Sequence, residues 1–247
     1  MMFFFKKKKL HVDAFISENY VAAYQTAPIQ YSTHFYPEWW KKLKNQHFDT
    51  DKFELIGSAK SCVGIIEFYR NSLTIPLWSD FIFTIDQNTK FKWQYSDSCS
   101  ILDVHETRMR AGFKENYLHL KHINPWLLKS EKNIKFDFKP DYYNNNSSSF
   151  DVMPGVTDYY YQNATNINFF VEKKPQVIFQ EFGFPMVNIS ARSEREILLK
   201  NHLIDQREYD KIYNEQRPIS FNKKFFKRVK QIEKLEKQKK CPFGFGD

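Results

Sequence analysis

The sequence predicts a mainly β protein, an antiparallel β barrel or sandwich with a helical, basic C-terminal extension. The length of 247 residues suits one large all-β domain or two small ones. Short segments in which apolar and polar residues alternate recur between residues 10 and 190. From residue 193 the apolar spacing becomes helical, so we divide the chain into a β-rich domain, 1–192, and an extension, 193–247.

Two elements are predicted before residue 60. Residues 10–16 alternate as a half-buried strand does. Residues 36–44 predict a short helix, because Pro37 suits the first helical position and Glu38 suits the N-terminus. Trp39 and Trp40 cannot face the same way along this helix, so we expect one to be buried and the other to lie at a rim or interface.

Residues 62–86 predict two strands joined by a turn at 70–71. Pro76 cannot donate to a ladder, so the second strand lies at an edge, starts late or bulges. Cys62 stands beside apolar residues and is interpreted as a core residue rather than a nucleophile. Residues 91–96 alternate again and are expected to pair with the preceding strand.

Further strands are predicted at 117–123, 134–140, 152–157, 166–172, 176–180 and 186–190. A polar loop, 142–149, interrupts this series. Ser193 and Glu196 have the spacing of a capping box, which predicts a helix, and Asp205 is a start for a second short helix.

The formal net charge of +8 is concentrated at the two ends of the chain. Residues 6–9 are four lysines, and residues 221–240 carry a net charge of +7, while the rest of the chain is close to neutral. The body is therefore not a basic DNA-binding surface. The basic extension, represented by Lys223, Lys224, Lys227, Arg228 and Lys230, is either a solvated tail or a segment that binds an acidic or phosphate-bearing partner.

Several classes of site and location are disfavoured by the sequence. Three widely spaced cysteines predict neither a disulfide framework nor a metal knuckle, and a reducing compartment is expected. No apolar run is long enough to span a bilayer, so no membrane association is expected. No nucleotide-cradling or cofactor-binding motif occurs, so we expect no cofactor.

The histidines between residues 105 and 122 are the candidates for a metal site. His119 and His122 are three residues apart, which places them on opposite faces of a strand. His105 and Glu106 could complete a site with one of them in three dimensions. No metal-binding spacing is present, and individual histidines without a metal are the preferred interpretation.

The segments at 125–138, 153–171 and 179–190 occur in an order that resembles an uncharacterised protein family of tailed phages and some bacteria. The resemblance implies a viral origin and an all-β core, and it implies no activity. It places the protein in the virion or in the cytoplasm of the infected host.

A second resemblance concerns the stretch "PGVTDYYYQNATNINFF" at 154–170. Gly155, Val156, Asp158 and Tyr161 are similar to the Gly-Val-x-Asp-x-x-Tyr turn of the trimeric dUTPases, which are β-clip enzymes. The resemblance implies Asp158 as general base and Tyr161 as the face that stacks on the base. The Gly-Arg-Ser-Ser phosphate motif of those enzymes does not occur in this chain.

Aromatic clusters provide the remaining candidate residues. On a strand, alternate side chains leave the core face, and exposed Tyr and Trp suit protein interfaces. The interface candidates are Trp39, Trp40, Tyr159, Tyr160 and Tyr161. We therefore expect a non-enzymatic phage protein that acts through a protein partner or self-association, with a nucleotide-binding or nucleotide-hydrolysing β-clip protein as the alternative.

Overall fold

The computed structural model describes residues 8–106, 112–144, 150–215 and 234 of the chain. Across these residues the protein is mainly β, as predicted, and most strand pairs are antiparallel. The sheets of the described part remain open, so the barrel is not formed there. The basic segment 221–240 lies almost entirely outside the described residues, and its predicted helix stays a prediction.

The strands are β1 (Leu10–Ser17), β2 (Gln30–Tyr31), β3 (Gln46–Asp49), β4 (Glu54–Gly57), β5 (Ser72–Pro76), β6 (Phe81–Ile85), β7 (Phe91–Tyr95), β8 (Leu102–His105), β9 (Tyr117–His122), β10 (Leu127–Ser130), β11 (Phe136–Pro140), β12 (Asp151–Val152), β13 (Gly155–Thr157), β14 (Ile167–Glu172), β15 (Gln176–Gln180), β16 (Pro185–Ala191) and β17 (Ile197–Ile204). The α-helices are α1 (Val21–Thr26), α2 (Glu38–Lys42), α3 (Val63–Tyr69) and α4 (Gln206–Glu215), and the 3₁₀ turns are η1 (Glu18–Tyr20), η2 (Ser32–Phe35) and η3 (Ala59–Ser61).

The central sheet has the strand order β13-β11-β16-β5-β2. All five residues of β5 are buried, because β5 lies between two neighbours and beneath the core. The irregularity predicted at Pro76 is present: Pro76 faces Pro185, and the register shifts between Pro185 and Val187. Two prolines meeting at the end of a strand pair remove both ladder donors there, which explains the bulge.

A three-stranded sheet, β10-β1-β17, joins the two ends of the described chain. The helix predicted from Ser193 is wrong for residues 197–204, which form β17 and pair in parallel with β1, from Leu10↔Ile197 to Ser17↔Ile204. The Ser193 hydroxyl accepts the backbone N–H of Arg195 at 3.1 Å and so caps a turn instead of a helix. Pairing with a buried strand outweighs the local helical spacing.

α3 is the second difference from the sequence prediction. Residues 63–69 are helical, whereas a strand is the prediction for this apolar run. Ile65 and Tyr69 are buried four residues apart, on one face of the helix. A short apolar run does not distinguish a buried strand from a helix by periodicity. Cys62 precedes the helix and is exposed, so its interpretation as a core residue is wrong.

Other predicted elements agree with the structure. The alternating segments at 10–16, 91–96 and 117–123 form β1, β7 and β9, and β7 pairs with β6 as expected. The helix start predicted at Asp205 is confirmed, because the Asp205 carboxylate accepts the backbone N–H of Glu208 at 2.8 Å.

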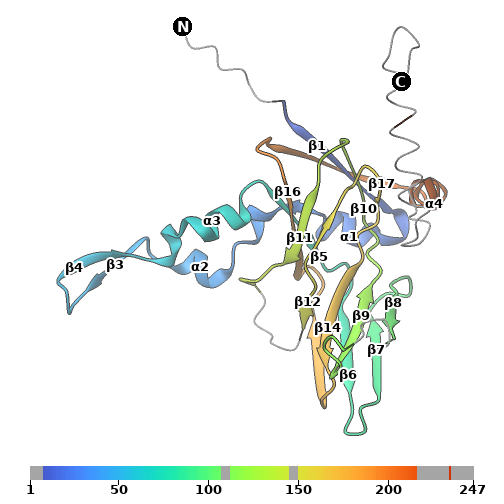
Figure 1. Ribbon diagram of the computed structural model, residues 1–247, viewed down its shortest axis with the longest axis horizontal. Coiled ribbons are helices and arrows are strands. Elements are labelled where there is room, and N and C mark those ends of the chain that lie inside the picture. Colours follow the sequence, from blue (N-terminus) through green and yellow to red (C-terminus); the bar gives the residue numbers. More distant parts are fainter. Residues whose placement is uncertain (1–7, 107–111, 145–149, 216–233, 235–247) are drawn as a thin grey trace, which may run out of the picture.

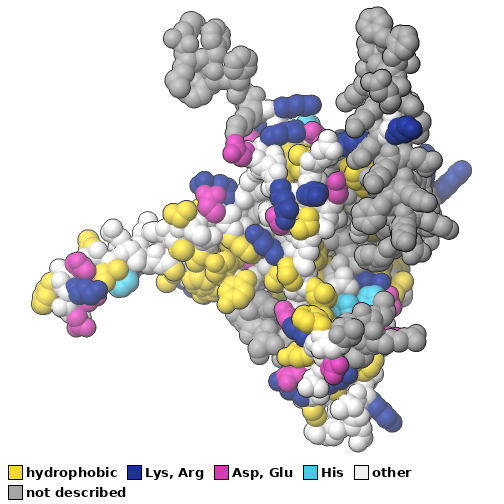
Figure 2. Space-filling view, viewed as in Figure 1, with side chains coloured by type: hydrophobic (Ala, Val, Ile, Leu, Met, Phe, Trp, Pro, Cys, Tyr) yellow, Lys and Arg dark blue, Asp and Glu magenta, His cyan; other side chains and the backbone are white. Residues whose placement is uncertain are grey.

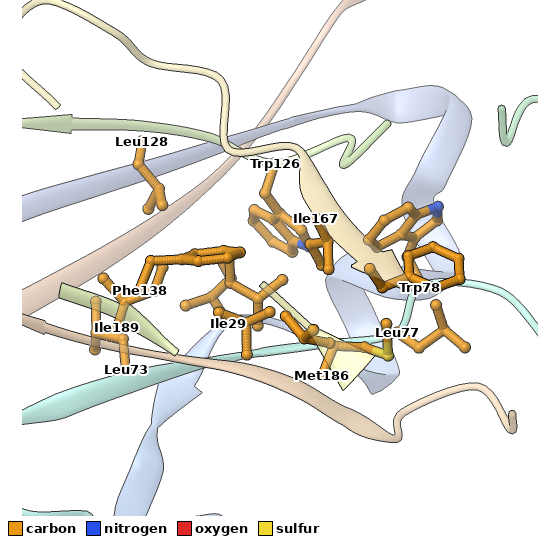
Figure 3. Close-up of a cluster of buried hydrophobic side chains, with 14 of the residues drawn as sticks. Ile29, Leu73, Leu77, Trp78, Trp126, Leu128, Phe138, Ile167, Met186 and Ile189 are labelled. Carbon is orange, nitrogen blue, oxygen red and sulfur yellow. The ribbon is translucent and has the colours of Figure 1, made fainter. Parts of the chain in front are cut away.

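The core lies between the central sheet and the other sheets. Figure 3 shows part of it, with labelled side chains Ile29, Leu73, Leu77, Trp78, Trp126, Leu128, Phe138, Ile167, Met186 and Ile189. Two further sheets, β12-β14-β9-β8 and β15-β6-β7, extend this core toward the bottom of Figure 1. Strands from all parts of the sequence thus contribute to one apolar cluster.

Candidate interaction surface

One segment projects from this body. Residues 36–70, here called the arm, run through α2, the β3–β4 hairpin, η3 and α3. Figure 1 shows β3 and β4 at the far left, reaching away from the sheets. β3 and β4 pair only with each other among the described strands, so the end of the arm is an isolated two-stranded ribbon.

The base of the arm is fixed to the body by aromatic contacts. Phe68 of the arm and Tyr143 of the body meet edge to face with ring centroids 5.2 Å apart, and within the arm the rings of Tyr36 and Trp40 stack at 4.2 Å. Tyr69 is fully buried, and its hydroxyl donates to the Asp141 carboxylate at 2.7 Å.

Asp141 is itself buried beneath the base of the arm. Burial raises the pKa of its carboxyl above the usual range, while hydrogen bonds from Tyr69 and Asn144 act against that rise. The Asn144 side-chain amide also donates to the carbonyl oxygen of Phe35 at 2.7 Å. The loop after β11 therefore holds both ends of the arm's base in place.

The end of the arm is apolar and exposed. Phe48 and Leu55 are opposite each other in the hairpin and point to the same side. Their exposed fractions are 55% and 65%, and Phe53 in the turn is 82% exposed. The rings of Phe48 and Phe53 are in edge-to-face contact with centroids 6.3 Å apart. We call Phe48, Phe53 and Leu55 the arm tip.

Phe53 has a backbone conformation that is unfavourable for its side chain. Its φ angle is +53°, in the left-handed region, where a bulky residue costs roughly 1–2 kcal/mol relative to glycine. The turn is held from the other side by Asp49, whose carboxylate accepts the N–H groups of Asp51 and Lys52 at 2.9 and 3.2 Å. Apart from its contact with Phe48, the Phe53 ring is mostly exposed, so an unfavourable backbone conformation holds an aromatic side chain at the surface.

Acidic side chains surround this apolar tip. The hairpin, 46–57, carries Asp49, Asp51 and Glu54 against Lys52. Figure 2 shows yellow hydrophobic and magenta acidic side chains together at the left end of the molecule. A surface of this kind is complementary to an apolar groove with cations at its rim.

A cleft of about 640 Å³ lies beside the root of the arm, between α3 and the turn that leads into β17. Four charged residues line it, the acidic Glu67, Glu194 and Glu196 and the basic Arg70, which pairs with Glu67 at 2.7 Å. The cleft and the arm tip therefore have the same sign of charge.

The tryptophans predicted as interface candidates both lie on the arm. Neither is buried, so the expectation that one of the pair is a core residue is wrong. The Trp39 indole N–H donates to the carbonyl oxygen of Tyr143, and that of Trp40 donates to the carbonyl oxygen of Ala59, each at 3.2 Å. Trp40 supports the base of the arm, while Trp39 is exposed beside it.

The three consecutive tyrosines differ in burial. Tyr159 is fully buried, packs on Phe136 and accepts the Thr165 hydroxyl at 2.7 Å. Its assignment as an exposed interface residue is wrong, because the turn at 158–162 directs this ring into the core. Tyr160 and Tyr161 are partly exposed and contact each other edge to face at 4.9 Å.

Asp158 begins that turn. Its carboxylate accepts the N–H of Tyr160 at 3.0 Å, and its carbonyl oxygen accepts those of Tyr161 and Gln162. Partial burial raises the pKa of Asp158, and the Tyr160 amide and Lys135 act against this rise. The nearby cleft of about 180 Å³ is lined by Phe138 and by residues of 153–157 and 162–168, and neither Asp158 nor Tyr161 is among its described lining residues. The catalytic roles that the dUTPase resemblance implies therefore stay predictions.

The histidines proposed for a metal site are distributed over both faces of one sheet. His105 and His119 face each other across β8 and β9 with rings 4.4 Å apart, whereas His122 is buried in the core. Within the described ranges no group of three or more His, Cys, Asp or Glu is placed to hold a metal ion. The candidate residues Lys223, Lys224, Lys227, Arg228 and Lys230 lie outside the described residues.

Sequence reasoning did not identify the arm tip. The stretch "HFDTDKFEL" at 47–55 contains the signal: two short alternating segments around an Asp-x-Asp turn. Its exposure follows from the rest of the fold and is not encoded locally.

In the part of the chain that the structure describes, no helix has both the length and the apolar character needed to cross a membrane. Comparisons of the chain with protein-family models, with curated proteins and with solved structures found no match.

Proposed function

We propose that this protein is a non-enzymatic binding factor whose arm inserts its apolar tip into a protein partner. The observation that carries the proposal is Phe53, which is 82% exposed and held at a positive φ at the end of an isolated hairpin. Phe53 lies with Phe48 and Leu55 in one exposed apolar group, and contiguous exposed apolar side chains mark interaction sites, whereas isolated ones do not. The partner offers an apolar groove rimmed by Lys or Arg.

The isolated hairpin gives a second reason for a partner. A two-stranded ribbon without further packing is marginally stable in water. Docking of the tip would bury apolar area and would add packing on the face that carries Phe48 and Leu55. The family resemblance supports a phage protein, in the virion or in the infected cell, as the setting for this contact.

The test places a photo-crosslinking amino acid at position 53 and, in a second variant, at position 90 in the exposed β6–β7 turn. Capture of one protein from position 53 alone defines the partner, which is then purified for binding measurements. If the captured protein is this chain itself, the arm mediates self-association. Equal capture from both positions contradicts the proposal.

Three variants then examine the contact with the purified partner. Phe53→Gly removes the aromatic side chain, so binding is expected to fall at least about tenfold. Because glycine also relieves the left-handed strain, thermal stability is expected to be unchanged or higher. Lys52→Ala, beside it in the turn, controls for a general effect on the hairpin. Phe179→Ser removes an aromatic side chain that is 56% exposed on β15 and is expected to leave binding unchanged. A Phe53→Gly variant that binds normally overturns the proposal.

A further inference from the structure

A small cavity of about 270 Å³ lies beside α4, where the end of β1 meets the loops that contain Cys99 and Asn124. Figure 1 shows α4 on the right of the view and β3–β4 on the left, so the cavity is distant from the arm tip. Its volume is close to the lower end of the range for small-molecule sites.

Aromatic side chains form much of the wall. Tyr20, Tyr209 and Tyr213 all line the cavity, and the rings of the last two are nearly parallel with centroids 6.4 Å apart. Aromatic rings attract organic cations through their negative faces, and enclosure strengthens that attraction.

The charges around the cavity have one sign. Among the residues that the structure describes, Asp210 is the one charged residue in the lining, and no described Lys or Arg contributes to it. The Gln206 side-chain amide donates to the Asp210 carboxylate at 2.8 Å and orients it. Burial, followed by the negative charge of Asp97, raises the pKa of Tyr20 to about 12. A negative potential in an aromatic cavity favours a monocation.

Asn124 also lines this cavity. Its side chain is 2% exposed, and its carbonyl oxygen accepts the Trp126 N–H at 3.1 Å. Its amide nitrogen Nδ2 has no hydrogen-bond partner among the described residues. An unpaired buried amide costs about 1–3 kcal/mol, and a bound acceptor would remove that cost.

We propose that this cavity binds a small organic monocation that also carries a hydroxyl or carbonyl oxygen. The cationic group lies among Tyr20, Tyr209 and Asp210, and the oxygen accepts a hydrogen bond from Asn124 Nδ2. This site is separate from the arm, so its presence or failure does not depend on the function proposed for the arm tip.

The test is isothermal titration calorimetry of the full chain with choline and with its neutral isostere 3,3-dimethyl-1-butanol, in which carbon replaces the charged nitrogen. We expect choline to bind and the isostere to bind at least about tenfold more weakly, because the rings and Asp210 recognise the charge. Asp210→Asn keeps the side-chain shape and is expected to weaken choline binding about tenfold.

Glu208→Gln removes one negative charge from the same helix outside the cavity and is the matched control, with choline binding expected to be unchanged. Absence of choline binding, equal affinity for choline and the isostere, or an Asp210→Asn variant with the affinity of the original chain would each overturn the proposal.

Discussion

His122 shows how the core constrains a single ionisable side chain. It is fully buried at the end of β9, its ring stacks on Phe169 at 4.6 Å, and Nδ1 hydrogen-bonds to the Tyr95 hydroxyl. Burial lowers the pKa of the imidazole to about 3, because the aromatic surroundings do not solvate a charge. The folded protein therefore keeps His122 neutral where the unfolded chain would protonate it.

This difference predicts a pH dependence of stability. The folded pKa is below the unfolded value of about 6.5, so the stabilisation is complete above pH 6.5 and is lost as the pH falls toward 3. The free energy of unfolding should decrease by up to about 1.4 kcal/mol per pH unit in this window from His122. Urea unfolding at a series of pH values measures the slope.

His122→Asn is the comparison for this prediction, because it keeps an acceptor near Tyr95 and does not titrate. It is expected to be less stable at pH 7, with a slope between pH 6 and 4 that is shallower by about 1 kcal/mol per unit. Parallel slopes for the two proteins would show that His122 is not the source.

Asn71 connects two elements through its side chain. Its φ angle is +48°, and its carboxamide donates to the Arg195 carbonyl oxygen and accepts the Ile197 N–H, both at 2.8 Å. The side chain therefore satisfies backbone groups at the start of β17, as another strand would. Asparagine is among the few residues that tolerate this conformation.

Two substitutions at Asn71 separate these effects. Asn71→Gly loses both hydrogen bonds and keeps the conformation, so the free energy of unfolding should fall by about 1–3 kcal/mol. Asn71→Ala loses the same bonds and adds roughly 1 kcal/mol of left-handed strain. Denaturant unfolding should rank the original chain above Gly and Gly above Ala; Ala equal to Gly would contradict the contribution of strain.

At the scale of elements, the β3–β4 hairpin should be the least stable part of the described sheets. Nearly all of its residues are exposed, and it lacks a third strand. Hydrogen exchange followed by mass spectrometry should show rapid exchange across 46–57 and slow exchange across β1 and β5. Addition of the partner should protect the hairpin selectively. Protection equal to that of β5 in the free protein would contradict this prediction.

Local pattern predicted most elements correctly and failed where tertiary contacts decide. Alternating segments such as 10–16 and 117–123 encode a buried and an outer face, so they form strands in any suitable sheet. Residues 63–69 and 197–204 contain apolar runs compatible with either structure. Only contact with the body, at Tyr69 in one case and along β1 in the other, decides between them.

The candidate site was less predictable than the fold. Trp39 and Trp40 lie on the arm, and the sequence identified them as interface candidates because adjacent tryptophans form an aromatic cluster. Phe48, Phe53 and Leu55 resemble ordinary strand residues and were therefore not identified. Whether such residues are covered depends on which strands reach them. That information is in the topology of the sheets and not in residues 46–57.

At the scale of the whole molecule, the described chain is closed by pairing of its first and last strands. β1 and β17 form a parallel pair in which residues about 190 positions apart in the sequence are neighbours, and Leu10, Ala14 and Ile16 are fully buried beside it. Arg195 strengthens this closure through a bidentate ion pair with Glu131, with N–O distances of 2.7 and 2.9 Å. Contacts this distant form late in folding because loop closure is costly.

This closure predicts different outcomes for two C-terminal truncations. A chain that ends at residue 205 retains β17 and loses α4, whose contribution to the body includes the buried Ile212 and the hydrogen bond from Asn163 to its carbonyl oxygen. We expect a cooperative thermal transition and a free energy of unfolding lower by about 2–4 kcal/mol.

A chain that ends at residue 196 also loses β17, which leaves one edge of β1 unpaired and uncovers the apolar residues beside it. It should show no cooperative transition by circular dichroism. A synthetic peptide spanning 197–215 should restore the transition when added in excess, because it supplies the missing β17 together with α4. If the 196-residue chain unfolds cooperatively near the temperature of the 205-residue chain, the parallel pair does not close the fold, and the described body is stable without β17.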